Sequence, residues 1–155
     1  MAALLRLQVA AQGFPLADVV QTRLVLEGAV VAALGADPRR DLAAARSVLD
    51  AMDDDALTPS EFLALDASLH YALAEAAGNT VITATMAGLR TAIESYVVEG
   101  AGRIARWDAM ASRLRAEHRA IVAAIEQGDG AKAQALVVSH ITGYYTAAGL
   151  VPGGA

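Results

Sequence analysis

Residues 107–144, WDAMASRLRAEHRAIVAAIEQGDGAKAQALVVSHITGY, determine the fold that the rest of the chain completes. Apolar residues recur at spacings of three and four on both sides of the stretch Gln127–Gly130, which predicts two helices joined by a tight turn. The two apolar stripes contain Trp107, Met110, Leu114, Ile121 and Ile125 before the turn, and Ala133, Leu136, Val137 and Tyr144 after it. His118 and His140 interrupt these stripes at nearly equal distances from the turn. An antiparallel hairpin would therefore bring the two imidazoles level with each other.

A second informative stretch predicts another helix, over residues 59–76. Thr58 is a good N-cap, Pro59 suits the first helical position, and Glu61 completes a capping box with Thr58. Asp66 and His70 are four residues apart and therefore share one side of this helix. They lie beside an apolar stripe of Phe62, Leu65, Leu69 and Leu73. An ionised carboxylate that faces a core is costly unless it is paired or bound to a cation.

Three imidazoles and one carboxylate are therefore expected to face a common interior. The set is Asp66, His70, His118 and His140, and it includes every histidine of the chain. Such donors suit a divalent metal, with zinc first and nickel, manganese or iron as alternatives. A bound divalent ion would leave the site with a net charge near +1, which suits an anionic ligand. For any one histidine taken alone, a hydrogen-bonded core role is the competing interpretation.

The whole pattern predicts an all-α fold, an antiparallel bundle of about six helices around a central ligand and metal cavity. No stretch has the alternation of a β-strand, and short loops between helices favour antiparallel neighbours. The predicted helices cover residues 16–34, 38–52, 59–76, 79–98, 106–127 and 131–148. Residues 1–15 are interpreted as a linker remnant, 16–149 as one domain, and 150–155 as a flexible tail.

Composition narrows the function classes. The net charge is −5, with 12 basic against 17 acidic residues. The densest basic group, Arg113, Arg115 and Arg119, is interleaved with Glu117, so the chain offers no basic surface for DNA. The chain has no cysteine for a disulfide. The longest uninterrupted apolar run considered, Ala29–Leu34, is far shorter than the roughly 20 residues of a membrane span. A cytoplasmic protein without a membrane partner is expected.

Several short motifs occur together in a recognisable order. They are RLVLE at residues 23–27, DASLH at 66–70, AGN at 77–79, the hairpin pattern EHRAI…AIEQGDGAKA over 117–133, and His140 at the matching distance. In these features the chain resembles the FCD domain, the C-terminal effector-binding and oligomerisation domain of the FadR subfamily of GntR-type bacterial transcription regulators. The resemblance extends from about Val19 to Tyr145. Leu69 replaces the phenylalanine usual in the family, which changes packing but not ligation.

The resemblance implies that Asp66, His70, His118 and His140 bind the metal. It also implies that Arg23 pairs with the carboxylate of a small carboxylic-acid effector, a contact suited to guanidinium geometry. An ordinary salt bridge from Arg23 to the residue four positions on, Glu27, is the alternative. Asn79 would be either a second effector contact or a helix cap.

Partners also follow from the resemblance. A homodimer is implied, and DNA would be bound only through an N-terminal winged helix-turn-helix domain. Nothing before Pro15 could form that domain, so the chain is expected to be a fragment or a stand-alone sensor. Effector binding would shift helix packing and re-space two attached DNA-binding domains.

Two competing functions remain open. A metal-dependent enzyme of the His/carboxylate type would use open positions on the metal. We expect no enzyme, because no general base is found on the same stripes and Glu117 is expected to point to a different face. A purely structural bundle would differ from a sensor in having no exchangeable position on its metal.

Overall fold

The computed structural model describes residues 13–150, and within that range it contains six helices and no strand. The helices are α2 (Leu16–Ala36), α3 (Ala43–Ala51), α4 (Pro59–Ala77), α5 (Thr80–Ala101), α6 (Trp107–Glu126) and α7 (Gly130–Ala147). The predicted all-α bundle is confirmed. The linker and tail predicted for residues 1–15 and 150–155 lie mostly outside the described residues.

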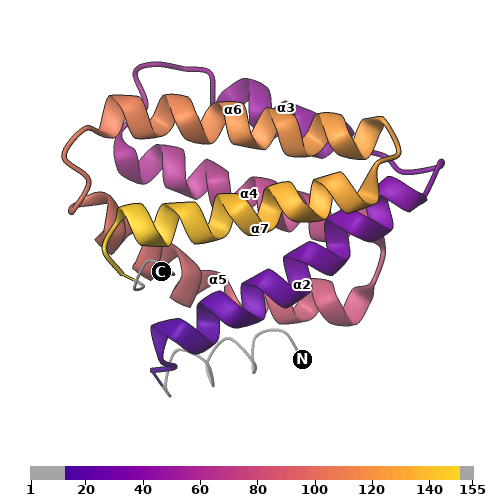
Figure 1. Cartoon of the computed structure of the whole chain (residues 1–155), viewed down its shortest axis with the longest axis horizontal. Coiled ribbons are helices and arrows are strands. Elements are labelled where there is room, and N and C mark those ends of the chain that lie inside the picture. Colours follow the sequence, from indigo (N-terminus) through magenta and orange to yellow (C-terminus); the bar gives the residue numbers. More distant parts are fainter. Residues whose placement is uncertain (1–12, 151–155) are drawn as a thin grey trace.

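The helices form a bundle whose long axes run mainly across the view of Figure 1. The hairpin partners α6 and α7 lie side by side, and α4 is seen between them. The first described helix, α2, crosses α7 obliquely and also contacts α4, while α5 packs against α4. Three helices, α4, α6 and α7, therefore present inward faces to one another at the middle of the molecule.

The capping signals of α4 act as the sequence predicts. The Thr58 side chain accepts a hydrogen bond from the N–H of Glu61 at 3.3 Å, and Glu61 accepts from the N–H of Thr58 at 2.8 Å. At the other end Gly78 ends the helix with a left-handed φ of 75°, a conformation that glycine adopts without strain. These two ends fix the length of α4 and leave Asp66 and His70 in its middle.

Two glycines, Gly35 and Gly100, lie just beyond the predicted helix ends at residues 34 and 98, but the structure places them inside α2 and α5, where they allow close packing. A methyl group added to Gly35 would lie 2.4 Å from the Cα of Gly130, so α2 and α7 touch there through their backbones. A methyl group on Gly100 would lie 3.0 Å from the side chains of Ala148 and Leu150. At each position the absence of a side chain leaves room for a neighbouring segment. The helices α2 and α5 therefore do not end where the sequence predicts.

The predicted start of the second helix at Pro38 is wrong, because α3 begins at Ala43. Two aspartates hold the intervening residues in turns. The Asp37 side chain accepts a hydrogen bond from the N–H of Arg39, and the Asp41 side chain from that of Ala43, both at 2.9 Å. Such local bonds compete with helix formation, and proline is as common in turns as at helix starts.

Among the described helices, α2 alone is long and apolar enough to cross a membrane by length and composition. Counting uninterrupted apolar runs misses it, because Arg23 and Glu27 divide the helix while its mean hydropathy over 18 residues stays at 1.5. Half of that window is buried inside the bundle, and both charged residues are buried with it. A core helix of a bundle gives the same pattern.

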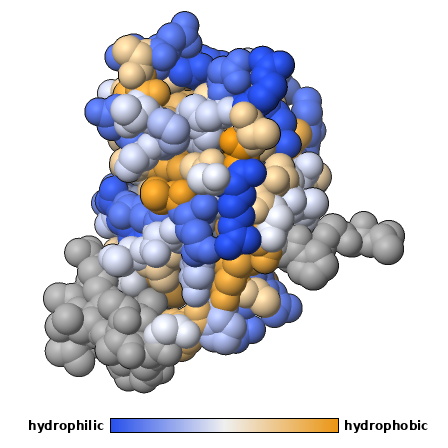
Figure 2. Space-filling model, turned by 90° about the vertical axis from the view of Figure 1, so that its left-hand side faces the viewer, coloured by the Kyte–Doolittle hydropathy of each residue, from blue (hydrophilic) through white to orange (hydrophobic). Residues whose placement is uncertain are grey.

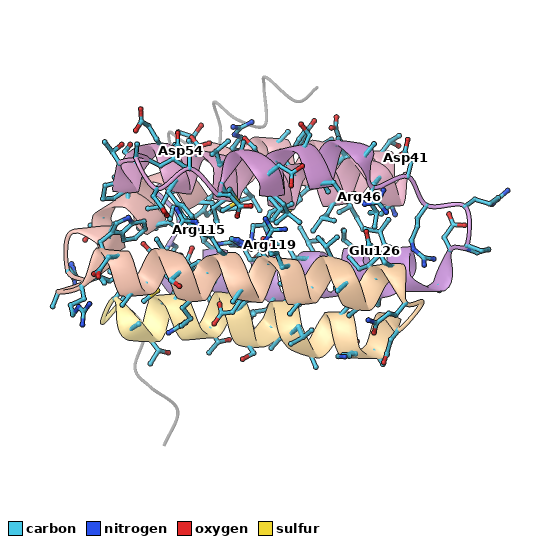
Figure 3. The ribbon with its side chains drawn as sticks, turned by 90° about the horizontal axis from the view of Figure 1, so that it is seen from above. Asp41, Arg46, Asp54, Arg115, Arg119 and Glu126 are labelled. Carbon is cyan, nitrogen blue, oxygen red and sulfur yellow. The ribbon has the colours of Figure 1, made fainter. Side chains whose placement is uncertain are left out.

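Charged side chains gather on the side of α3 and α6. Figure 3 shows Arg46 of α3 and Glu126 of α6 directed toward one another, and their charged atoms are 2.8 Å apart. Arg115 of α6 donates from Nε to the backbone oxygen of Met52 at 2.6 Å, which ties the end of α3 to α6. In the end-on view of Figure 2 hydrophilic residues likewise cover the top of the molecule, where these helices lie.

Candidate metal centre

Four side chains from three helices meet at the middle of the bundle. Asp66 and His70 come from α4, His118 from α6 and His140 from α7. Each offers one ligand atom, and these atoms all lie within 4.8 Å of one another. All four residues are at most 5% exposed. The structure thus brings together the complete set of candidate ligands named from the sequence.

The α6–α7 hairpin sets the relative height of the two imidazoles it carries. Gly128 turns the chain with a φ of 76°, and the Asp129 side chain caps α7 by accepting from the N–H of Lys132 at 2.9 Å. The short turn keeps both helices in register, and the Nε2 atoms of His118 and His140 lie 3.1 Å apart. The antiparallel hairpin thus brings His118 and His140 to the same level, as their nearly equal distances from the turn predict.

On the α2 side of the cluster, His70 is held by the buried carboxylate of Glu27, which the sequence indicates only as a possible partner of Arg23. Its Nδ1 contacts Oε2 of Glu27, while its Nε2 faces the other ligands. Glu27 in turn accepts from Nε of Arg23 at 2.6 Å, and Arg23 donates from Nη1 to the Tyr145 hydroxyl at 3.2 Å. Arg23 therefore makes the salt bridge to Glu27 that the sequence left open as an alternative.

A second carboxylate holds His140 in the same way. Oε2 of Glu117 lies 2.8 Å from Nδ1 of His140, and Oε1 of Glu117 accepts from Nε of Arg113 at 2.8 Å. The expectation that Glu117 points away from the site is wrong. The Cα of Glu117 lies beside the apolar stripe of α6, but its side chain is long enough to reach His140 on α7. The helical angle alone could not reveal that contact.

These two contacts decide which ring nitrogens face the centre. In neutral rings, the carboxylates of Glu27 and Glu117 accept the N–H of Nδ1, so Nε2 of His70 and of His140 each keeps a lone pair. Those two Nε2 atoms lie 3.3 Å apart. Oδ1 of Asp66, 2.8 Å from Nε2 of His118, adds another acceptor. Acceptors that converge on one buried point fit a cation, and this donor set suits a divalent metal.

One nitrogen of the cluster has no partner. The Nδ1 atom of His118 is buried and makes no hydrogen bond among the described residues. Its ring is thus oriented only through Nε2, which lies close to both Asp66 and His140. A bound metal would replace those contacts with a stronger one, so His118 is the imidazole that depends most on an ion for its orientation.

The carboxylates of the site are ionised. Burial by itself would raise the pKa of Asp66, but the hydrogen bond from His118 and the charges of the imidazoles outweigh it and hold that pKa well below its usual range. Burial also opposes ionisation of Glu27, yet Arg23 and His70 lower the pKa of Glu27 to about 2. At neutral pH both groups are therefore negatively charged.

The imidazoles respond to this field in opposite ways. Burial, together with the neighbouring His118, lowers the pKa of His140 to about 4, which keeps that ring neutral as a metal ligand must be. For His70, burial is outweighed by the carboxylates of Glu27 and Asp66, so the pKa of His70 is raised. The two carboxylates thus favour the protonated form of His70 more than those around His140 do.

Two tight cavities flank the cluster, each with about 10 Å³ of free space, which is about the room that one water molecule needs. One is bounded by α5 as well as by Arg23, Glu27 and His70. The other reaches Asp66 and His140. Arg23 lines both of them. The central cavity expected from the sequence is thus a buried polar cluster with little open space around it.

Asn79 lies apart from this cluster in a different environment. Asn79 is exposed at the start of α5. The side-chain oxygen accepts from the N–H groups of Val81 and Ile82, both at 3.1 Å, which is a regular N-cap. Of the two interpretations left open for Asn79, the helix cap accounts for its side chain, and an effector contact stays a prediction.

Comparison with known proteins supports the motif order found in the sequence. A search among curated proteins finds none that matches the chain. The family model of the FCD domain matches residues 18–143, which include Arg23 and all four candidate ligands. The FCD domain is the effector-binding domain of GntR-family transcription regulators. Because the match covers most of the chain, this protein belongs to the FCD domain family.

Proposed function

We propose that this chain is the effector-sensing and dimerisation domain of a FadR-type GntR regulator, and that it binds a divalent metal together with a small carboxylate metabolite. The observation that carries the proposal is the orientation of His70 and His140. Each gives Nδ1 to a carboxylate and turns Nε2 toward the same buried point. Two such arrangements around one centre are typical of metal sites, where outer carboxylates fix the ligating tautomer.

Four side chains would hold the ion. Asp66, His70, His118 and His140 supply one ligand atom each, and zinc is the first choice, with nickel, manganese or iron as alternatives. The ion would supply positive charge and coordination positions for a carboxylate oxygen. The nearest other carboxylates, Glu27 and Glu117, are engaged with imidazole nitrogens and arginines. They are poorly placed to act as general bases, which favours sensing over catalysis.

Arg23 is the proposed partner of the effector carboxylate. It donates to Glu27 and Tyr145, and a guanidinium has five N–H donors, so donors remain for a ligand. Because Arg23 lines both cavities beside the cluster, a carboxylate between the metal and Arg23 could contact both. A negatively charged effector suits this pairing of two positive charges.

The small size of the cavities suggests how binding would be transmitted. An effector larger than water would have to part α5 from α2 and α4, because residues of all three helices line the first cavity. Such a shift in helix packing could change the spacing of two protomers in a dimer, and with it DNA binding by an attached winged helix-turn-helix domain. This role would be exercised in the cytoplasm.

A thermal-shift experiment tests the proposal. Acetate, malonate and citrate are added to the metal-stripped chain and to the zinc-loaded chain, and melting temperatures are compared with those in chloride. We expect at least one acid to raise the melting temperature of the zinc-loaded chain only. Arg23→Lys keeps the positive charge beside Glu27 but loses the paired N–H donors of the guanidinium, and it should weaken that response. Equal shifts with and without zinc would contradict a metal-anchored effector site.

A further inference from the structure

A chain of contacts connects the buried cluster to solvent. Arg113 is 41% exposed in its side chain, Glu117 30%, and His140 only 4%. The Arg113 guanidinium holds one oxygen of Glu117, and the other oxygen of Glu117 holds Nδ1 of His140, each at 2.8 Å. The carboxylate behind His70 has no such exposure, because Glu27 and Arg23 are both buried. Of these two outer carboxylates, only the one behind His140 can be reached from the surface.

Gly143 of α7 makes room for this arrangement. A methyl group added there would lie 2.8 Å from Nη2 of Arg113, so the guanidinium rests on bare helix backbone. The backbone of Gly143 does not have a positive φ, and thus its conformation does not call for glycine. A glycine inside a helix lowers the stability of that helix. What Gly143 provides in return is space for the guanidinium of Arg113.

We propose that Arg113, seated over Gly143, is a positioning residue that sets the metal affinity of the buried site from the protein surface. It fixes Glu117 so that the free carboxylate oxygen meets His140, and His140 is thereby held with Nε2 toward the metal. The inference rests on the proposed metal site. It adds that a solvent-exposed ion pair, which contributes little to folding stability, controls how tightly the ion is held.

The geometry gives this proposal an unusual signature. Gly143→Ala should stabilise α7, since alanine is the better helix former. Among the described residues, the only side chain within 3 Å of the new methyl group is the flexible end of Arg113, which can move aside without disturbing the bundle. The same substitution should weaken metal binding, because Arg113 then no longer clamps Glu117. A purely structural role for these residues would not separate stability from affinity in this way.

The experiment measures Zn²⁺ affinity of the full chain by competition with a chromophoric chelator, and the visible spectrum of the Co²⁺-loaded chain. Removing an outer-shell partner typically lowers metal affinity by roughly 10–100-fold, so we expect such a loss for Glu117→Gln. Arg113→Met and Gly143→Ala should each show a smaller, several-fold loss, and Gly143→Ala should melt at a higher temperature. The double variant should lose no more zinc affinity than Arg113→Met alone, because both changes remove the same contact between Arg113 and Glu117. The Co²⁺ spectrum should change in Glu117→Gln.

Arg103→Met is the matched control. Arg103 forms the same kind of surface pair with the residue four positions before it, Glu99, at 2.8 Å, but neither residue contacts a histidine. This variant should bind zinc as the parent does. Parent-like zinc affinity in both Arg113→Met and Gly143→Ala would overturn the proposal. A parent that binds no zinc would overturn the metal site itself, and that result needs no variant to be recognised.

Discussion

His70 and His140 each divide their two ring nitrogens between the centre of the cluster and a carboxylate at its edge. That division is the chemical basis of the site, because it selects the tautomer in which Nε2 is free to bind a cation. The two carboxylates differ in their surroundings. Glu27 is buried with Arg23, whereas Glu117 reaches the surface with Arg113.

The buried position of Glu27 leads to the first prediction. Glu27→Gln removes the charge that balances Arg23, which would remain buried with no other ion pair among the described residues. We expect the free energy of unfolding to fall by about 3 kcal/mol, the lower end of the cost of breaking a buried ion pair. Urea denaturation of the metal-stripped chain measures it. Glu94→Gln breaks the half-exposed pair with Arg90, and this control should change stability by less than about 1 kcal/mol.

The second prediction concerns the protonation of His140 in the metal-stripped chain. Burial, with the nearby His118, lowers the pKa of His140 from 6.5 to about 4. As the pH falls from 6.5 toward 4, the unfolded chain takes up a proton that the folded ring refuses, so this group favours the folded state less and less. His70, with its raised pKa, contributes in the opposite direction. An NMR titration should place the His140 midpoint near 4, and a midpoint at 6.5 or above would contradict the assigned environment.

At this scale the sequence predicts which candidate ligands meet at the centre, but not the residues that orient them. Asp66, His70, His118 and His140 lie on or beside apolar stripes, so helical spacing alone indicates that they face inward. Glu27 and Glu117 act across helix boundaries, through side chains whose reach depends on how α2 and α7 pack. The i, i+4 relation of Glu27 to Arg23 was visible, but it indicated a salt bridge and gave no sign of His70.

The crossing of α2 and α7 shows how single residues determine the packing of whole helices. Gly35 and Gly130 allow backbone to meet backbone, so α2 and α7 approach one another closely at this crossing. Helix crossings of this kind depend on small side chains at the contact, because the interaxial distance follows the side chains between the helices.

The third prediction tests that crossing. Gly35→Ala puts a methyl group 2.4 Å from the Cα of Gly130, where backbone cannot move aside cheaply. We expect a loss of roughly 1–3 kcal/mol, as for other overpacked contacts. Gly28→Ala in the same helix meets only the Gln134 side chain at 3.5 Å. That control should be neutral or stabilise by up to about 1 kcal/mol. Chemical denaturation of both variants measures the difference, and equal effects would contradict the role of Gly35.

Helix number and type could be predicted from periodicity and caps, as the agreement over α4, α6 and α7 indicates. The residues at which the helices begin and end are harder to predict from the sequence. The start of α3 cannot be read from Pro38, because proline suits a turn as well as a helix start, and the turns around it depend on Asp37 and Asp41. Gly35 of α2 and Gly100 of α5 are each explained by a close tertiary contact, which the sequence alone does not reveal.

On the scale of the whole molecule, the candidate ligands are buried, whereas most ion pairs lie at the surface. Ion pairs such as Arg46–Glu126 join α3 to α6 at the surface (Figure 3), while the candidate ligands lie buried at the centre on α4, α6 and α7. An ion held there would join helices that are far apart in the sequence. Metal loading should therefore stabilise the entire bundle, since a ligand that binds only the folded state shifts the folding equilibrium.

The most direct test of the central claim is a calorimetric titration of the metal-stripped chain with Zn²⁺, with His118→Ala and His140→Ala as companions. We expect about one zinc ion per chain. The parent should gain about 2.7 kcal/mol of stability when free zinc exceeds the dissociation constant 100-fold. Both variants should lose most of the binding heat. A parent that takes up no zinc, nickel, manganese or iron, or variants that bind as the parent does, would show that the buried histidines are not a metal site.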